Sequence, residues 1–140
     1  MGSRSAEYRV LLAVANRDLD RLAIDFAISR PGVRSHFCAQ ADAVDFVRGR
    51  AVDLILLDVD GSLMAAFVLA AQIRAACRVR DACGSVAIVA ATSSECRFQD
   101  CLVGGSAIDG ALKTPCDFAR FGECVDHWCL AEDFRSRRAR

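Results

Sequence analysis

The chain has 140 residues, of which 54% are hydrophobic and 26% charged, and this composition indicates a single globular domain rather than a disordered chain. Its 18 Lys and Arg balance its 18 Asp and Glu, and the net charge of zero gives no support for a protein that binds nucleic acid or a membrane surface. No apolar run is long enough to span a membrane, and residues 1–5 contain no apolar core of a signal peptide, so we expect a cytoplasmic protein.

The chain also contains eight cysteines, none of them in a Cys-x-x-Cys pair. The spacings of zinc sites and thioredoxin-type sites are therefore absent. Because no secretion signal is present, a disulfide framework is not expected, and we interpret most of the cysteines as small buried hydrophobic residues. Cys77 and Cys83 flank a polar connection and are the candidates for a reactive thiol.

Five apolar runs alternate along the chain with five segments of helical spacing. The runs predict strands at Tyr8–Ala15, Val33–Ala39, Leu54–Leu57, Val86–Ala91 and Ala107–Leu112. The other segments predict helices at Leu19–Ala27, Ala41–Arg48, Leu63–Ala76, Glu95–Val103 and Asp117–Glu132. Strands separated by helices require crossover connections, which favour a parallel sheet covered on both faces. Because such crossovers are right-handed, we predict a doubly wound α/β domain.

The spacing of apolar residues also predicts which face of each helix is buried. In the third predicted helix, four residues are expected to face the core: Met64, Phe67, Val68 and Ala71. In the last predicted helix, the residues at core spacing are Phe118, Phe121, Val125 and Trp128.

Asp58 directly follows the third predicted strand. Leu54–Leu57 is apolar throughout, as in a strand that is buried on both faces of a parallel sheet. The carboxyl ends of parallel strands form the edge where open α/β sheets bind ligands, and a carboxylate there requires a cation, a hydrogen bond or water. Two interpretations stay open at this point: Asp58 acts as a nucleophile or metal ligand, or it only caps the strand-to-loop turn.

Polar residues end the other strands at the same edge. They are Asn16 after the first strand, Asp60 beside Asp58, Thr92 at the end of the fourth strand, and Lys113 after the fifth. With these residues, the chain resembles the receiver domain of two-component response regulators over residues 8–133. The firmest stretches of the resemblance are DLILLD (Asp53–Asp58), IVAAT (Ile88–Thr92) and LKTP (Leu112–Pro115).

The resemblance implies a fold and a phosphorylation site. The fold is flavodoxin-like, a five-stranded parallel sheet of order 2-1-3-4-5 with five helices, and it leaves residues 1–7 as an N-terminal extension and 134–140 as a basic tail. Asp58 matches the aspartate that accepts a phosphoryl group from a histidine kinase. Thr92 matches the hydroxyl residue that forms hydrogen bonds with the phosphoryl oxygens.

The sequence departs from the receiver pattern at the groups that neutralise the phosphoryl charge. The acidic pair that holds magnesium corresponds to Ala15 and Asn16, and the lysine before the proline corresponds to Thr114. Lys113 is one residue early, and because side chains alternate along a strand we expect it to point away from the site. The family's aromatic switch residue corresponds to Ala111.

These departures predict a degenerate receiver that keeps the fold and Asp58 and acts as a docking module rather than an enzyme. The resemblance implies a sensor histidine kinase or another signalling protein as partner, and a possible homodimer through the last two strand–helix units. The alternative is a working phosphoacceptor, in which Asp58, Asp60 and Asn16 hold magnesium, with Asp18 close enough in sequence to add a charge.

A second alternative is an enzyme. Asp58-Val-Asp60-Gly61-Ser62 resembles the first motif of haloacid dehalogenase-type phosphatases, with Asp58 as nucleophile, Asp60 as general acid/base, and Thr92 and Lys113 as the later motifs. In those enzymes the motif lies near the start of the chain and is followed by a hairpin. Here about fifty residues precede it and Ser62 leads directly into a predicted helix, so the receiver interpretation is favoured.

Overall fold

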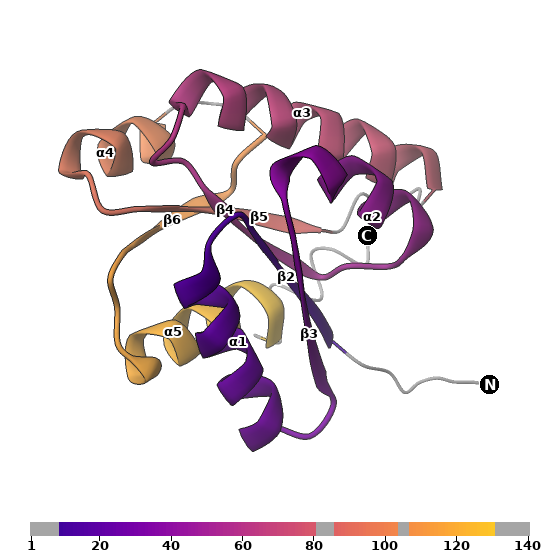
Figure 1. Ribbon diagram of the computed structural model, residues 1–140, viewed down its shortest axis with the longest axis vertical. Coiled ribbons are helices and arrows are strands. Elements are labelled where there is room, and N and C mark those ends of the chain that lie inside the picture. The colour runs from indigo at the N-terminus through magenta and orange to yellow at the C-terminus, as the bar shows by residue number, and fades with distance from the viewer. Residues whose placement is uncertain (1–8, 81–85, 104–106, 131–140) are drawn as a thin grey trace.

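The structure, a computed structural model, describes residues 9–80, 86–103 and 107–130. Within these ranges the chain forms one parallel sheet with helices on both faces (Figure 1). The strands are β2 (Arg9–Val14), β3 (Val33–Cys38), β4 (Leu54–Asp58), β5 (Ala87–Thr92) and β6 (Gly110–Lys113). They lie in the order β3-β2-β4-β5-β6. Counted along the chain this is 2-1-3-4-5, so the predicted fold is confirmed.

Strand β4 is the central strand, and the apolar run that predicted it explains its position. Its four residues before Asp58 are fully buried. Ile55 and Leu57 pack into one core and Leu54 and Leu56 into the other, because alternate side chains point to opposite faces of the sheet. Every residue of this strand except the last therefore requires an apolar side chain, and Asp58 is left at the edge.

The helices divide between the two faces of the sheet. Their bounds are α1 (Arg17–Ser29), α2 (Ala43–Gly49), α3 (Leu63–Arg80), α4 (Glu95–Val103) and α5 (Phe118–Val125). Helices α1 and α5 pack on one face, and α2, α3 and α4 cover the other (Figure 1). A single 3-10 turn (Gln40–Asp42) precedes α2, and a π-helical turn (Asp126–Leu130) continues α5.

The predicted inward face of α3 is wrong. Met64 and Val68 are 69% and 53% exposed, Ala71 is exposed, and only Phe67 packs partly against the core. The helix instead buries Ala66, Leu69, Ala70, Ile73, Ala76 and Cys77. A shift of two residues turns the face by about 200°. Both faces of α3 are largely apolar, so spacing alone did not decide between them.

Several smaller predictions also need correction. In α5, Phe121 and Val125 are buried as predicted, but Phe118 is 43% exposed and lies against Phe26 with ring centroids 6.2 Å apart. The fifth strand begins at Gly110 rather than at residue 107, and the carboxylate of Asp109 accepts a hydrogen bond from the backbone N–H of Ile88.

Most of the described cysteines are buried, as the sequence predicts. Five described cysteines are buried, Cys116 is half-buried and Cys96 is exposed. Cys77 packs in the core on α3 and is not an accessible thiol, contrary to its selection as a reactive candidate. Cys83 and the predictions for residues 1–7 and 134–140 lie outside the described residues. Of the helices in the described ranges, none has the length and apolar character needed to cross a membrane.

Candidate functional site

Asp58 lies half-buried at the carboxyl end of β4, where its carboxylate accepts two hydrogen bonds. One oxygen accepts from the backbone N–H of Asp60 at 2.7 Å. The other oxygen accepts from the side-chain amide of Asn16 at 2.9 Å. Both donors are neutral groups, so these hydrogen bonds satisfy the carboxylate without neutralising its charge.

Asn16 is held in this orientation by helix α1. Its side-chain oxygen caps the helix by accepting from the backbone N–H of Leu19 at 3.0 Å. The preceding residue, Ala15, has a φ of 64°, a left-handed conformation that is uncommon for residues other than glycine. With the oxygen engaged by the helix, the amide NH2 group is the part that faces Asp58.

Asp60 extends from the loop after β4 to the end of β5. Its carboxylate accepts from the hydroxyl of Thr92 at 2.5 Å, from the hydroxyl of Ser93 at 3.0 Å and from the backbone N–H of Ser93 at 3.1 Å. The Thr92 hydrogen bond has the largest effect on the pKa of Asp60, which lies below its usual value. Ser93 and the charge of Arg97 lower this pKa further, and partial burial opposes them.

Arg97 of helix α4 fixes the backbone on the other side of this loop. One guanidinium nitrogen donates to the carbonyl of Val59 at 2.5 Å and to the carbonyl of Asp60 at 2.8 Å. The N–H, the carbonyl and the carboxylate of Asp60 therefore each have a partner, in β4, α4 and β5 respectively.

A cavity of about 370 Å³ opens beside these groups. Asn16, Asp60 and Ser93 line its polar side, together with Asp18 and Thr114. The apolar side is made by Leu19, Leu22, Pro115 and Cys116. The cavity therefore lies beside the Asp58 site, between the start of α1 and the residues that follow β4, β5 and β6.

Comparison with known proteins identifies the fold. No family model matches the sequence, and no curated protein matches it either. Solved structures do match. A response regulator from Thermotoga maritima superimposes with a TM-score of 0.69 at 13% identity, covering 89% of this chain and 99% of that chain. A two-component response regulator from Clostridium difficile gives a TM-score of 0.67 at 18% identity, covering 91% of this chain and 98% of that one.

A third match is the receiver domain of the Saccharomyces cerevisiae response regulator Ssk1, solved with the histidine phosphotransfer signalling protein Ypd1. It gives a TM-score of 0.67 at 17% identity and covers 91% of this chain and 92% of that chain. The chain has the fold of a response-regulator receiver domain.

Within the receiver fold, the structure brings together four of the five residues singled out from the sequence. Asn16 contacts Asp58, and Asp60 bridges from Asp58 to Thr92. Lys113 does not join them. Its ammonium group donates to Glu95 and lies 5.9 Å from the centre of the Phe98 ring, both on α4.

The residue directly after β6, Thr114, borders the site and lines the cavity. The alternation of side chains along the strand accounts for this, because consecutive residues point to opposite faces. The cavity therefore has a threonine hydroxyl at the position where the receiver resemblance implies a lysine.

The groups around Asp58 do not fit magnesium. Magnesium requires an octahedral set of oxygen ligands. The side-chain oxygen of Asn16 is engaged by α1, the carbonyl of Asp60 by Arg97, and the carboxylate of Asp60 by Thr92 and Ser93. Within the described ranges, no group of three His, Cys, Asp or Glu residues could hold a metal ion.

Sequence reasoning missed two features of the site. The first is Arg97, which lies on the first turn of α4 and belongs to no recognisable motif. The second is the direction of the Asp60 side chain, which follows from the hydroxyl groups of Thr92 and Ser93. The position of Asp60, two residues after Asp58, was a signal for the direction of its side chain, since a short loop can bring the Asp60 carboxylate to the neighbouring strand.

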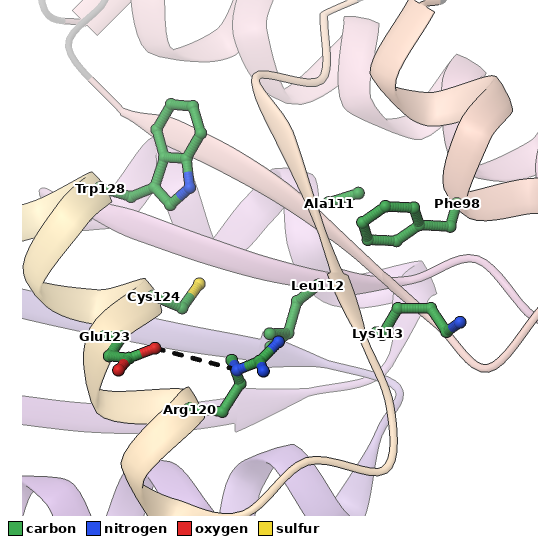
Figure 2. Close-up of a pocket in the computed structure, with 8 residues that line it drawn as sticks. All are labelled: Phe98, Ala111, Leu112, Lys113, Arg120, Glu123, Cys124 and Trp128. Atoms are coloured by element: carbon green, nitrogen blue, oxygen red, sulfur yellow. Dashed lines mark ion pairs between the residues drawn. The ribbon is translucent and has the colours of Figure 1, made fainter. Parts of the chain in front are cut away.

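A second hollow lies beside β6, between α4 and α5, with a volume of about 220 Å³ (Figure 2). Its lining residues are Phe98, Ala111, Leu112, Lys113, Arg120, Glu123, Cys124 and Trp128. We call it the β6 cleft. The indole of Trp128 packs directly on β6, and a Cβ atom added at Gly110 would lie 2.4 Å from its ring.

Proposed function

We propose that the protein is a cytoplasmic regulatory module with the receiver fold, which acts mainly by binding signalling proteins and is not an enzyme. Asp58 is its candidate phosphoacceptor. The observation that carries the proposal is the set of partners of Asp58, whose two hydrogen bonds come from the neutral N–H groups of Asn16 and Asp60.

The chemistry of phosphoryl transfer explains why these partners matter. Transfer to a carboxylate is accelerated mainly by positioning and by cationic groups that stabilise the negative charge on the transferred group. Lys113 donates to Glu95, and Arg97 donates to backbone carbonyls, so both cations are engaged away from the Asp58 carboxylate. We therefore expect Asp58 to be phosphorylated slowly or not at all.

The β6 cleft is the surface that we propose for partner binding. Leu112 and Cys124 form a buried floor with Phe98 and Trp128 half-buried beside them, while the rim carries the exposed charges of Lys113, Arg120 and Glu123 (Figure 2). An apolar centre with a polar rim is typical of protein interfaces. The binding of the structurally similar yeast Ssk1 receiver to a phosphotransfer protein supports a signalling protein as partner, and a second copy of this chain is the alternative occupant.

One incubation tests the proposed chemistry. The protein is treated with phosphoramidate, with and without magnesium, and its intact mass is followed beside an Asp58→Asn control. We expect little or no phosphorylated protein under either condition. A stable phosphorylated form that requires magnesium and is lost in Asp58→Asn would support the working phosphoacceptor instead. Steady phosphate release from a small phosphomonoester, abolished in Asp60→Asn, would support the phosphatase alternative.

A further inference from the structure

The end of β5 presents several hydrogen-bond donors to one point. Thr92 is the buried polar residue of the described core, with none of its surface exposed. Its hydroxyl oxygen accepts from the backbone N–H of Ser94 at 3.0 Å, which leaves the hydroxyl proton free to be donated. The backbone N–H and the hydroxyl of Ser93 point to the same place. Converging donors of this kind bind an oxyanion.

The carboxylate of Asp60 occupies this point. Its two oxygens together accept from the Thr92 hydroxyl, the Ser93 hydroxyl and the Ser93 N–H, at 2.5 to 3.2 Å. Two further hydrogen bonds hold the backbone of Asp60, because its N–H donates to Asp58 and its carbonyl accepts from Arg97. The backbone of Asp60 is therefore fixed in a position from which its side chain reaches the donors.

We propose that the carboxylate of Asp60 is an internal ligand, which fills the oxyanion site of Thr92 and Ser93 and must leave before that site can accept a phosphoryl or other tetrahedral oxyanion. This inference rests on the proposed receiver-like site and adds a regulatory contact to it. The loop between β5 and α4 is then held in an anion-bound arrangement whether or not Asp58 is modified.

Two physical reasons make the occupancy exclusive. The hydroxyl protons of Thr92 and Ser93 are single donors that cannot serve a carboxylate and an incoming dianion at once. A dianion placed beside both Asp58 and Asp60 would also bring three negative groups together, which costs free energy in a partly buried site. Asp60 lines the adjacent cavity of about 370 Å³, which gives its side chain space to move into.

The internal contact is tested by amide exchange at Ser93, which requires no phosphorylation. In Asp60→Ala, the Ser93 amide should exchange on the order of tenfold faster than in the wild type, because a hydrogen bond to a charged acceptor is lost. Asp18→Asn removes a carboxylate from the same cavity without touching Thr92 or Ser93 and should leave this rate unchanged. If Asp60→Ala does not fold, Asp60→Asn replaces it in the experiment. This variant keeps the side-chain volume and should show a smaller increase in the exchange rate of the Ser93 amide.

Occupancy is tested with inorganic phosphate in an Asp58→Asn background, where no phosphoryl transfer to residue 58 can occur. Adding Asp60→Ala should allow phosphate to shift the Ser93 amide resonance saturably, whereas the single Asp58→Asn variant should show no such shift. Unchanged Ser93 exchange in Asp60→Ala, or an equal phosphate response with Asp60 present, would overturn the proposal. Failure of the wild type to be labelled by phosphoramidate bears only on the chemistry of Asp58.

Discussion

The Asp58 site and the β6 cleft lie on the same sheet and are built on opposite principles. At the Asp58 site, polar groups are matched within the chain, with Asn16 serving Asp58 and Asp60 serving Thr92. At the β6 cleft, Lys113 pairs with Glu95 and Arg120 with Glu123, but these ion pairs are exposed to solvent around an apolar floor. The contrast supports our proposal that the β6 cleft binds partners, because its charged groups face solvent while the polar groups at the Asp58 site are hydrogen-bonded within the chain.

The largest effect is expected from Gly110→Ala at the β6 cleft. The added methyl group would lie 2.4 Å from the Trp128 ring, so either the indole or the strand must move. We expect a loss of about 3 kcal/mol in the free energy of unfolding, measured with urea. Gly49→Ala is the matched control, because a Cβ atom there meets nothing within 4 Å. Equal stability of the two variants would contradict the tight packing of the cleft wall.

At the Asp58 site, Thr92→Val should have the next largest effect. The substitution keeps the shape of a buried side chain and removes the hydroxyl that joins Asp60 to the Ser94 N–H. We expect about 2 kcal/mol of destabilisation in urea unfolding, because the Asp60 carboxylate and the Ser94 N–H each lose a hydrogen-bond partner. Thr114→Val, which changes a hydroxyl that lines the adjacent cavity, should cost less than half as much. Similar losses would show that the Asp60 contact adds nothing specific.

Asn16→Ala removes two roles of one side chain, and comparison with a variant that loses only a helix cap separates them. It removes both the cap of α1 and the hydrogen bond to Asp58, and we expect about 1.5 kcal/mol of destabilisation. Asp117→Ala removes only a cap, that of α5, where Asp117 accepts from the Arg120 N–H, and should cost about 1 kcal/mol. If Asn16→Ala costs less than Asp117→Ala, the bond between Asn16 and Asp58 does not contribute to stability.

The smallest expected effect is a difference in the reactivity of the thiols, two of which, Cys116 and Cys124, line the two hollows. Burial raises the pKa of Cys116 and raises that of Cys124 to about 12, so at pH 8 almost none of the Cys124 thiol is in its reactive thiolate form. Alkylation with iodoacetamide, followed by peptide mapping, should modify exposed Cys96 first, Cys116 later and Cys124 last. Raising the pH to 10 should still leave Cys124 largely unmodified. Modification of Cys124 as early as Cys96 would show that the cleft opens in solution.

The fold could be predicted from the sequence because its decisive signals are local. An apolar run ending in Asp58 specifies a central strand, and alternation with helical segments specifies a parallel sheet. The inward face of α3 could not be predicted, since Met64 and Ala66 lie on opposite sides of a helix that is largely apolar on both.

At the site, the sequence places Asn16, Asp58 and Thr92 at one edge of the sheet, because parallel strands end there. It does not specify which way a loop carboxylate turns or which cation meets the loop. The contacts of Asp60 with Ser93 and of Arg97 with the Asp60 carbonyl depend on how α4 packs beside β5 and β6, and that packing is set by the whole fold.

A crystal structure grown in magnesium would test the central claim most directly. We expect the hydrogen bonds of the site to remain. The Asn16 amide should still donate to the Asp58 carboxylate, the Asp60 carboxylate should still accept from Thr92 and Ser93, and Arg97 should still donate to the Asp60 carbonyl. A magnesium ion bonded to Asp58 and to the Asp60 carbonyl, with Arg97 displaced and the Asp60 side chain turned away from Thr92, would contradict it.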